Sequence, residues 1–186
     1  MQQYGIRFEQ TRIPYLITIF SCMPIFLFIY FVPVNADSQF YQDVENFIDQ
    51  NLFGRVGMWS SVFPLPSKVI TNYVCVVAPV LSLFFTWSTI KHSAFRATDY
   101  PASPVRLIAL MLCWVVLIVF LLYVFIVDET NLASDGRRYG YFGRYRILYA
   151  FWSSAILYGA CVMTLVSYMI FRFFPVVIIN KLRLSR

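Results

Sequence analysis

The chain has 186 residues, of which 60% are hydrophobic and only 13% are charged, and its formal net charge is +6. This composition is too apolar for a water-soluble globular domain and is typical of a protein embedded in a bilayer.

Apolar segments long enough to cross roughly 30 Å of hydrocarbon dominate the chain. They cover about residues 13–34, 69–90, 105–127 and 147–171. Only helices and closed barrels satisfy their backbone groups in lipid, and nothing outside these segments can bury a core. We therefore predict an all-α fold, a polytopic membrane protein built as a four-transmembrane-helix bundle.

The connecting segments complete a single integral-membrane domain over residues 1–186, with outer loops at 35–68 and 128–146 and an inner loop at 91–104. The first segment has a second interpretation, because Val34-Asn35-Ala36 before Asp37 has the small-residue spacing of a signal-peptide cleavage site. Its apolar stretch of about 22 residues is longer than the roughly 7–15 of a signal core, which favours a span.

Basic residues indicate the topology, because an even number of spans puts both termini on one side. That side has nine: Arg7, Arg12, Lys91, Arg96, Arg106, Arg172, Lys181, Arg183 and Arg186. The other side has six: Arg55, Lys68, Arg137, Arg138, Arg144 and Arg146. The positive-inside rule therefore predicts that both termini are cytoplasmic.

The outer loop 35–68 contains a helical pattern with an amphipathic period. Its apolar residues recur at three- and four-residue steps, at Phe40, Val44, Phe47, Ile48 and Leu52. Such spacing predicts an outer amphipathic helix that starts after Asp37 or Ser38 and ends at Gly54. We expect it on the outer surface, with its apolar stripe on the span ends or in the headgroup region. A partner-docking role is a further possibility.

Small and hydroxylated residues form a stripe along the second span: Thr71, Cys75, Ala78, Ser82, Thr86 and Thr89. The fourth span has a similar set: Ser153, Ala155, Gly159, Ala160, Thr164 and Ser167. Small residues let a second helix approach closely. The stripes either pack inside the bundle or receive helices of another membrane protein. The third span, rich in Leu, Val and Ile, is expected to be more exposed to lipid.

An arginine-rich stretch precedes the last span. Its basic and aromatic residues are Arg137, Arg138, Tyr139, Tyr141, Arg144, Tyr145 and Arg146. These arginines could pair with acids of the outer loops, with lipid phosphates, or with acidic groups of a partner protein.

Groups for catalysis are not apparent. The four cysteines, Cys22, Cys75, Cys113 and Cys161, lie in four different spans without a CxxC pair, and His92 is the only histidine. No charged residue lies in the interior of a span, as ion-coupled transport usually requires. We expect no enzyme activity, no catalytic residue, no metal and no cofactor, and the chemistry that remains is recognition.

A set of short motifs runs from the second span to the C-terminus: Lys68-Val69, Cys75-x-x-Ala78-Pro79-x-Leu81-x-Leu83, Leu132-x-x-x-Gly136-Arg137, Tyr168, Pro175-Val176 and Lys181-Leu182. In these motifs, and in length and loop proportions, the chain resembles the four-span immunity proteins that protect bacteria against pore-forming colicins of the colicin A, B and N type. The resemblance begins at Lys68.

The resemblance implies an inner-membrane protein that meets the pore-forming domain of a cognate colicin in the bilayer and stops the pore from opening. Toxin helices would dock on a small-residue stripe while outer-loop arginines select the partner. Membrane lipids are the other expected contact, and we expect no nucleic acid and no small-molecule substrate. The alternatives are an accessory subunit of a membrane complex, a thiol- or quinone-dependent membrane enzyme, and a channel.

Overall fold

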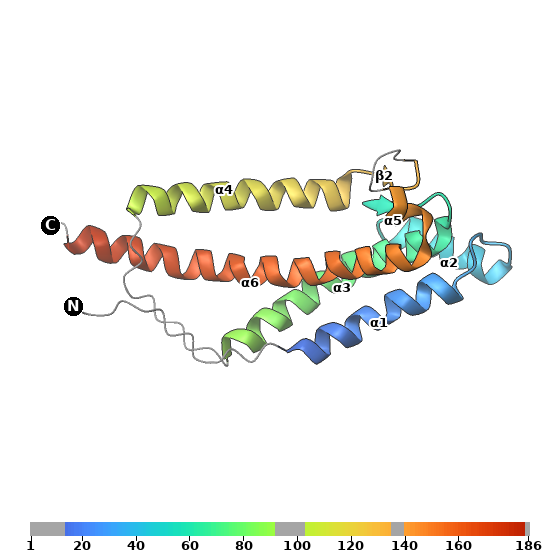
Figure 1. Cartoon of the computed structure of the whole chain (residues 1–186), viewed down its shortest axis with the longest axis horizontal. Helices are drawn as coiled ribbons and strands as arrows, with labels where there is room; N and C mark the ends of the chain where they lie inside the picture. The colour runs from blue at the N-terminus through green and yellow to red at the C-terminus, as the bar shows by residue number, and fades with distance from the viewer. Residues whose placement is uncertain (1–13, 92–102, 135–139, 185–186) are drawn as a thin grey trace.

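The computed structural model describes residues 14–91, 103–134 and 140–184 as an elongated helical bundle (Figure 1). In chain order the elements are α1 (Tyr15–Phe31), α2 (Gln39–Asn51), β1 (Met58–Trp59), α3 (Pro64–Lys91), α4 (Pro104–Leu122), the π-helix η1 (Tyr123–Val127), β2 (Thr130–Asn131), α5 (Gly140–Arg144) and α6 (Arg146–Leu184).

Three helices are long and apolar enough to cross a membrane: Pro64–Lys91, Pro104–Phe125 and Arg146–Ile179. They occupy the second, third and fourth predicted spans. In the first predicted span, 13–34, the structure has the shorter apolar helix α1 of 17 residues, and residue 13 lies outside the described part. The described part of the chain is therefore mostly helical, and three of its helices are long and apolar enough to span a membrane.

Helix α6 is the axis around which the others pack. It contacts α1, α3 and α4, with α4 along one side and α1 and α3 along the other (Figure 1). Its 39 residues extend about 58 Å at 1.5 Å per residue, well beyond the roughly 30 Å of a hydrocarbon core. The predicted fourth segment ended at residue 171, whereas the helix continues through Pro175.

The apolar core lies where α1, α3 and α6 meet. Ile25 and Ile29 of α1, Ile70 of α3 and Leu157 of α6 are fully buried there. Helix α4 takes little part, because Leu107 is its only buried residue. A hydrogen bond from its Trp114 Nε1 to Ser167 Oγ of α6, at 2.9 Å, ties the two helices. The third span thus presents most of its surface away from the bundle, as its composition predicted.

Short elements close one end of the bundle. We call this end, formed by α2, β1, β2 and α5, the capped end (Figure 1). Strands β1 and β2 pair in parallel over two residues each, and the Thr130 N–H donates to the Gly57 carbonyl at 3.1 Å. The cap therefore connects the segment after α2 to the chain that leaves η1.

Two glycines let backbones meet within the cap. Gly57 has a φ of +59°, and a Cβ there would lie 2.5 Å from the Phe125 carbonyl oxygen of η1. Gly143 of α5 lies directly against the backbone of Leu132 and Ala133, and its carbonyl accepts a hydrogen bond from Ser60 Oγ. A side chain at either position would push backbone atoms apart.

The packing predicts that Gly57→Ala lowers the free energy of unfolding by about 1–3 kcal/mol, through left-handed backbone strain and the collision with η1. Gly159→Ala is the matched control, because a Cβ added there on α6 would have no atom within 4 Å. Thermal unfolding of the purified detergent-solubilised variants measures both. Equal melting temperatures for the two variants would contradict the tight packing at Gly57.

Candidate functional site

A buried lysine lies at the start of α3. The Lys68 side chain is 6% exposed, and its Nζ lies 3.1 Å from Glu45 Oε1 and 2.6 Å from Asp49 Oδ1. Lysine is almost never buried without a partner. The two carboxylates are four residues apart on α2, so they share one helical face. Lys68 therefore fixes the acidic face of α2 against α3.

Asn72, one turn beyond Lys68, holds the segment that follows α2. Its Nδ2 donates to the Gly54 carbonyl at 2.7 Å and its Oδ1 accepts from the Phe53 N–H at 3.0 Å. Helix α2 ends at Asn51, three residues before the predicted Gly54, and Gly54, with a φ of +64°, donates its N–H back to the Ile48 carbonyl. Both polar atoms of the buried Asn72 amide thus serve the connection between α2 and α3.

Tyr149 brings α6 into the same polar junction. Its side chain is fully buried, and its hydroxyl donates to the Met58 carbonyl of β1 at 3.0 Å. Ser67 Oγ accepts from the Ser60 N–H and donates its one proton to the Pro64 carbonyl at 2.9 Å, with the Ser60 carbonyl 3.2 Å away. We use the name polar junction for Ser60, Ser67, Lys68, Asn72 and Tyr149. It joins α2, β1, α3 and α6 at the capped end.

Sequence reasoning singled out Lys68 as a motif residue and Tyr149 as an aromatic residue at a span boundary, and it missed the role of both in the polar junction. The available signal was a pair of polar residues, Lys68 and Asn72, at helical spacing at the beginning of an apolar segment. The acids at Glu45 and Asp49 have the same four-residue spacing. Two such pairs in adjacent segments indicate two facing helices.

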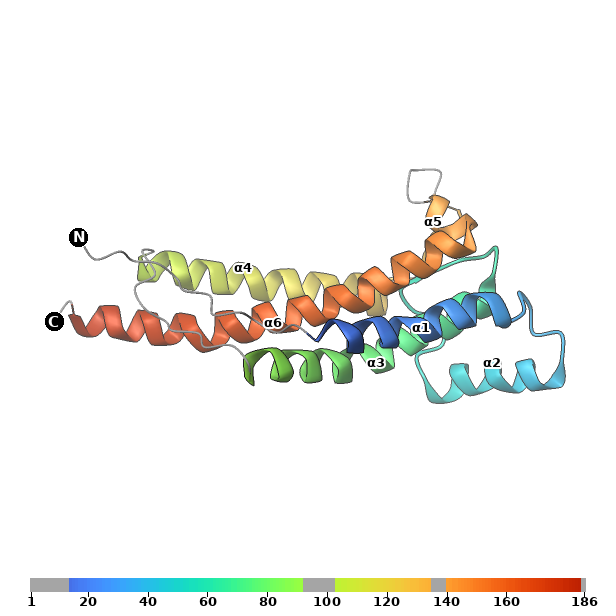
Figure 2. The same ribbon diagram turned by 60° about the horizontal axis from the view of Figure 1, so that its bottom comes forward.

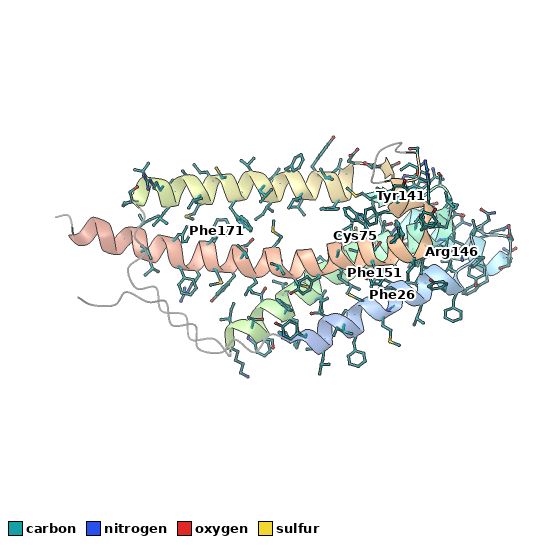
Figure 3. All side chains as sticks on the ribbon, viewed as in Figure 1. Phe26, Cys75, Tyr141, Arg146, Phe151 and Phe171 are labelled. Atoms are coloured by element: carbon teal, nitrogen blue, oxygen red, sulfur yellow. The ribbon has the colours of Figure 1, made fainter. Side chains whose placement is uncertain are left out.

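The arginine-rich stretch is described only in its second half, because Arg137, Arg138 and Tyr139 lie outside the described residues. Arg144 is exposed, and Arg146 begins α6 half-buried. The exposed rings of Tyr141 and Tyr145 stack beside them with centroids 6.4 Å apart. We call Tyr141, Arg144, Tyr145 and Arg146 the cationic corner. Figure 3 shows Tyr141 and Arg146 at the capped end, far from Phe171.

The cationic corner has no ion pair with any described acid. Both ion pairs in the described part of the chain belong to Lys68. Arg55, another cation of this end, lies over the ring of Trp59, 4.8 Å from its centroid. Pairing of the described arginines with Glu45 and Asp49, one of the predicted possibilities, is therefore not what the structure has. The other two predicted partners of these arginines are lipid phosphates and acidic groups of a partner protein.

The stripe on α3 divides into two halves. Thr71, Cys75 and Ala78 are half-buried, whereas Ser82 and Thr86 are buried. A partner helix cannot reach the second half unless the bundle opens, so these residues serve internal packing in this structure. The stripe and the cationic corner belong to different elements, α3 on one hand and α5 and α6 on the other.

The stripe of α6 is also divided. Ser153 is buried, whereas Ala155 is exposed and Gly159 faces open space. These two residues, spaced four apart, leave a shallow small-residue surface on the outside of α6. Nearby, the Phe151 ring meets Phe26 of α1 edge to face at 5.3 Å (Figure 3).

Reactive groups are dispersed in the described residues. Cys22, Cys75, Cys113 and Cys161 are all free thiols. The described ranges contain no group of three or more His, Cys, Asp or Glu side chains that could hold a metal ion.

Comparison with protein-family models, curated proteins and solved structures finds no match to this chain.

The geometry at Lys68 predicts that removal of the two carboxylates lowers the free energy of unfolding more than removal of the lysine. The double variant Glu45→Gln with Asp49→Asn leaves a buried ammonium without an anion, which we expect to cost about 3 kcal/mol. Lys68→Met leaves carboxylates whose side chains are 38% and 48% exposed and can hydrate, so about 1 kcal/mol is expected. Unfolding by SDS in mixed micelles measures both. A Lys68→Met variant at least as destabilised as the double variant would contradict the burial of this lysine.

Proposed function

We propose that the chain is an immunity protein that protects its bacterium from a pore-forming colicin by binding the toxin's channel domain in the inner membrane and blocking pore opening. The resemblance in the motifs from Lys68 onward is one support. The structural observation that carries the proposal is the exposed apolar surface of α4, which has one buried residue along its whole length. In a bilayer such a face is open to lipid and to the helices of an inserting protein.

In this proposal α1 is also a span, the first of four in chain order. Its 17 residues are mostly apolar, and it packs against α3 and α6, two of the helices long enough to span. Both termini are then cytoplasmic, as the distribution of basic residues predicts, and the capped end faces the periplasm. A colicin arriving from the periplasm meets the capped end first.

Recognition would divide between charge and helix packing. The cationic corner, together with Arg137, Arg138 and Tyr139 of the same stretch, offers guanidinium groups that bind carboxylates in a bidentate manner. The half-buried residues Thr71, Cys75 and Ala78 of α3 and the Ala155–Gly159 surface of α6 admit close approach of an apolar helix. Ser82 and Thr86 are assigned to internal packing instead.

The experiment that tests this function is survival and potassium retention of sensitive cells that express the chain, challenged with a panel of pore-forming colicins. A nuclease colicin, which kills without a membrane pore, is the control. Protection against one or two pore formers with unchanged killing by the nuclease is the expected result. Sensitivity to every pore former of the colicin A, B and N type, with the chain present in the membrane, would contradict the proposal.

The double variant Arg144→Gln with Arg146→Gln tests the role of the cationic corner. Because these cations have no acidic partner among the described residues, we expect normal expression but a loss of protection of at least tenfold in the toxin dose survived, equivalent to about 1.4 kcal/mol of binding. Arg106→Gln, which removes an exposed cation at the other end of the bundle, is the control and should protect normally. Full protection by the double variant would exclude the corner from toxin selection.

An accessory subunit of a membrane complex is the second candidate, because the exposed face of α4 also suits a permanent helical partner. Expression of the chain alone distinguishes the two. An immunity protein is expected to be stable without a partner, whereas an accessory subunit is expected to be degraded or to co-purify with a fixed stoichiometry of another membrane protein.

A further inference from the structure

Helix α2 is amphipathic in an unusual sense, because two of its three charged residues, Glu45 and Asp49, face the protein. Glu45 and Asp49 point to Lys68 of α3, and Ile48 on the same side is buried. Figure 2 shows α2 running back alongside the ends of α1 and α3, roughly along the bundle. The side of α2 that contacts the bundle is therefore a mixed, largely acidic face.

The remaining circumference of α2 divides into two sectors at 3.6 residues per turn. One sector adjoins Asp49 and is wholly polar and exposed: Gln39, Gln42, Asp43, Asn46 and Gln50. The other lies between that polar sector and Ile48 and contains Phe40, Val44 and Phe47. Asn51 is its one polar residue, and its amide donates to the Phe47 carbonyl at 3.3 Å.

The aromatic sector is uncovered. Phe40 is 68% exposed and Phe47 is 56% exposed. The protein therefore leaves two large aromatic rings uncovered on the same side of α2. Other exposed aromatic residues lie in the chain before and after the helix, at Tyr30 and Phe31 of α1 and at Phe53 after α2.

We propose that α2 lies at the junction of bundle, water and lipid, with Phe40 and Phe47 inserted into the bilayer leaflet nearest the capped end. Because α2 runs roughly along the bundle, the two rings lie about 10 Å apart in depth. A helix in this position meets protein, water and lipid on its three sides, which suits the face that contacts Lys68, the exposed polar sector and the exposed aromatic sector. The neighbouring surface of α1 is the same kind of apolar surface, on a helix of the membrane bundle.

Attraction between opposite charges is not what holds α2 at the membrane. Amphipathic helices that bind anionic lipid usually present Lys and Arg on the polar face, and α2 has none. Lys68 tethers the helix from the protein side, and the aromatic side chains bury in lipid on the other. The depth of α2 is then expected to be the same in zwitterionic and in anionic bilayers.

Site-directed spin labelling of the full chain in phosphatidylcholine nanodiscs tests this placement. A single cysteine replaces Phe47 or Phe40 in a variant whose four native cysteines are alanine and whose melting temperature matches that of the native chain. The label at Asn46, in the polar sector, is the control. The measured quantity is the ratio of the label's collision rate with oxygen to its collision rate with a water-soluble nickel chelate. We expect this ratio to be at least threefold higher at positions 40 and 47 than at position 46. Equal ratios at 46 and 47, or shielding from both reagents by a protein partner, would overturn the proposal.

A second measurement uses the native chain and so does not depend on variant folding. Nanodiscs containing a phospholipid with a photoreactive group near the glycerol are irradiated, and adducts are located by mass spectrometry. We expect adducts on Phe40 and Phe47 and none on Gln42 or Asn46. Adducts on the exposed face of α4 without any on Phe40 or Phe47 would overturn the proposal. Neither result depends on whether the chain confers immunity.

Discussion

The arrangement of the capped end depends on one buried cation. Lys68 lies at the first turns of α3 with two carboxylates of α2 around its ammonium group, and burial makes that neutralisation obligatory. With α2 fixed in this way, Asn72 can hold the segment at Gly54, and β1 follows in position to pair with β2. Tyr149 then joins this assembly to α6, so many of the polar contacts between elements gather at the capped end.

Hydropathy predicted the long helices because lipid imposes a length and a composition on any spanning segment. It did not predict their ends. Helix α3 begins at Pro64, since proline is tolerated where the helical N–H groups have no partner, and α6 runs to Leu184 without a break at Pro175. The first segment is described as a helix of only 17 residues. The strands β1 and β2 have two residues each and no period from which to infer them.

The orientation of α2 could not be predicted from its hydrophobic periodicity, because a tertiary contact sets it. Periodicity finds the apolar stripe, and the usual inference places that stripe against the protein. Here the partner of α2 is a lysine 19 residues beyond Asp49, a tertiary contact that periodicity does not encode. The same limit affects the small-residue stripe of α3, which divides into a buried half at Ser82 and Thr86 and an accessible half nearer the cap. For the proposed immunity function, the surfaces left for a toxin are those that the bundle does not use.

The most direct test of the account is the distance between α2 and α3 measured by pulsed electron resonance on the full chain in nanodiscs. Spin labels at Asn46 of α2 and at the exposed Val80 of α3 report this distance in an otherwise cysteine-free chain with and without Lys68→Met. The account predicts one narrow distance distribution with Lys68 and a broad one in the variant. A narrow distribution at the same distance in the variant would contradict the claim that the buried lysine holds α2 in place.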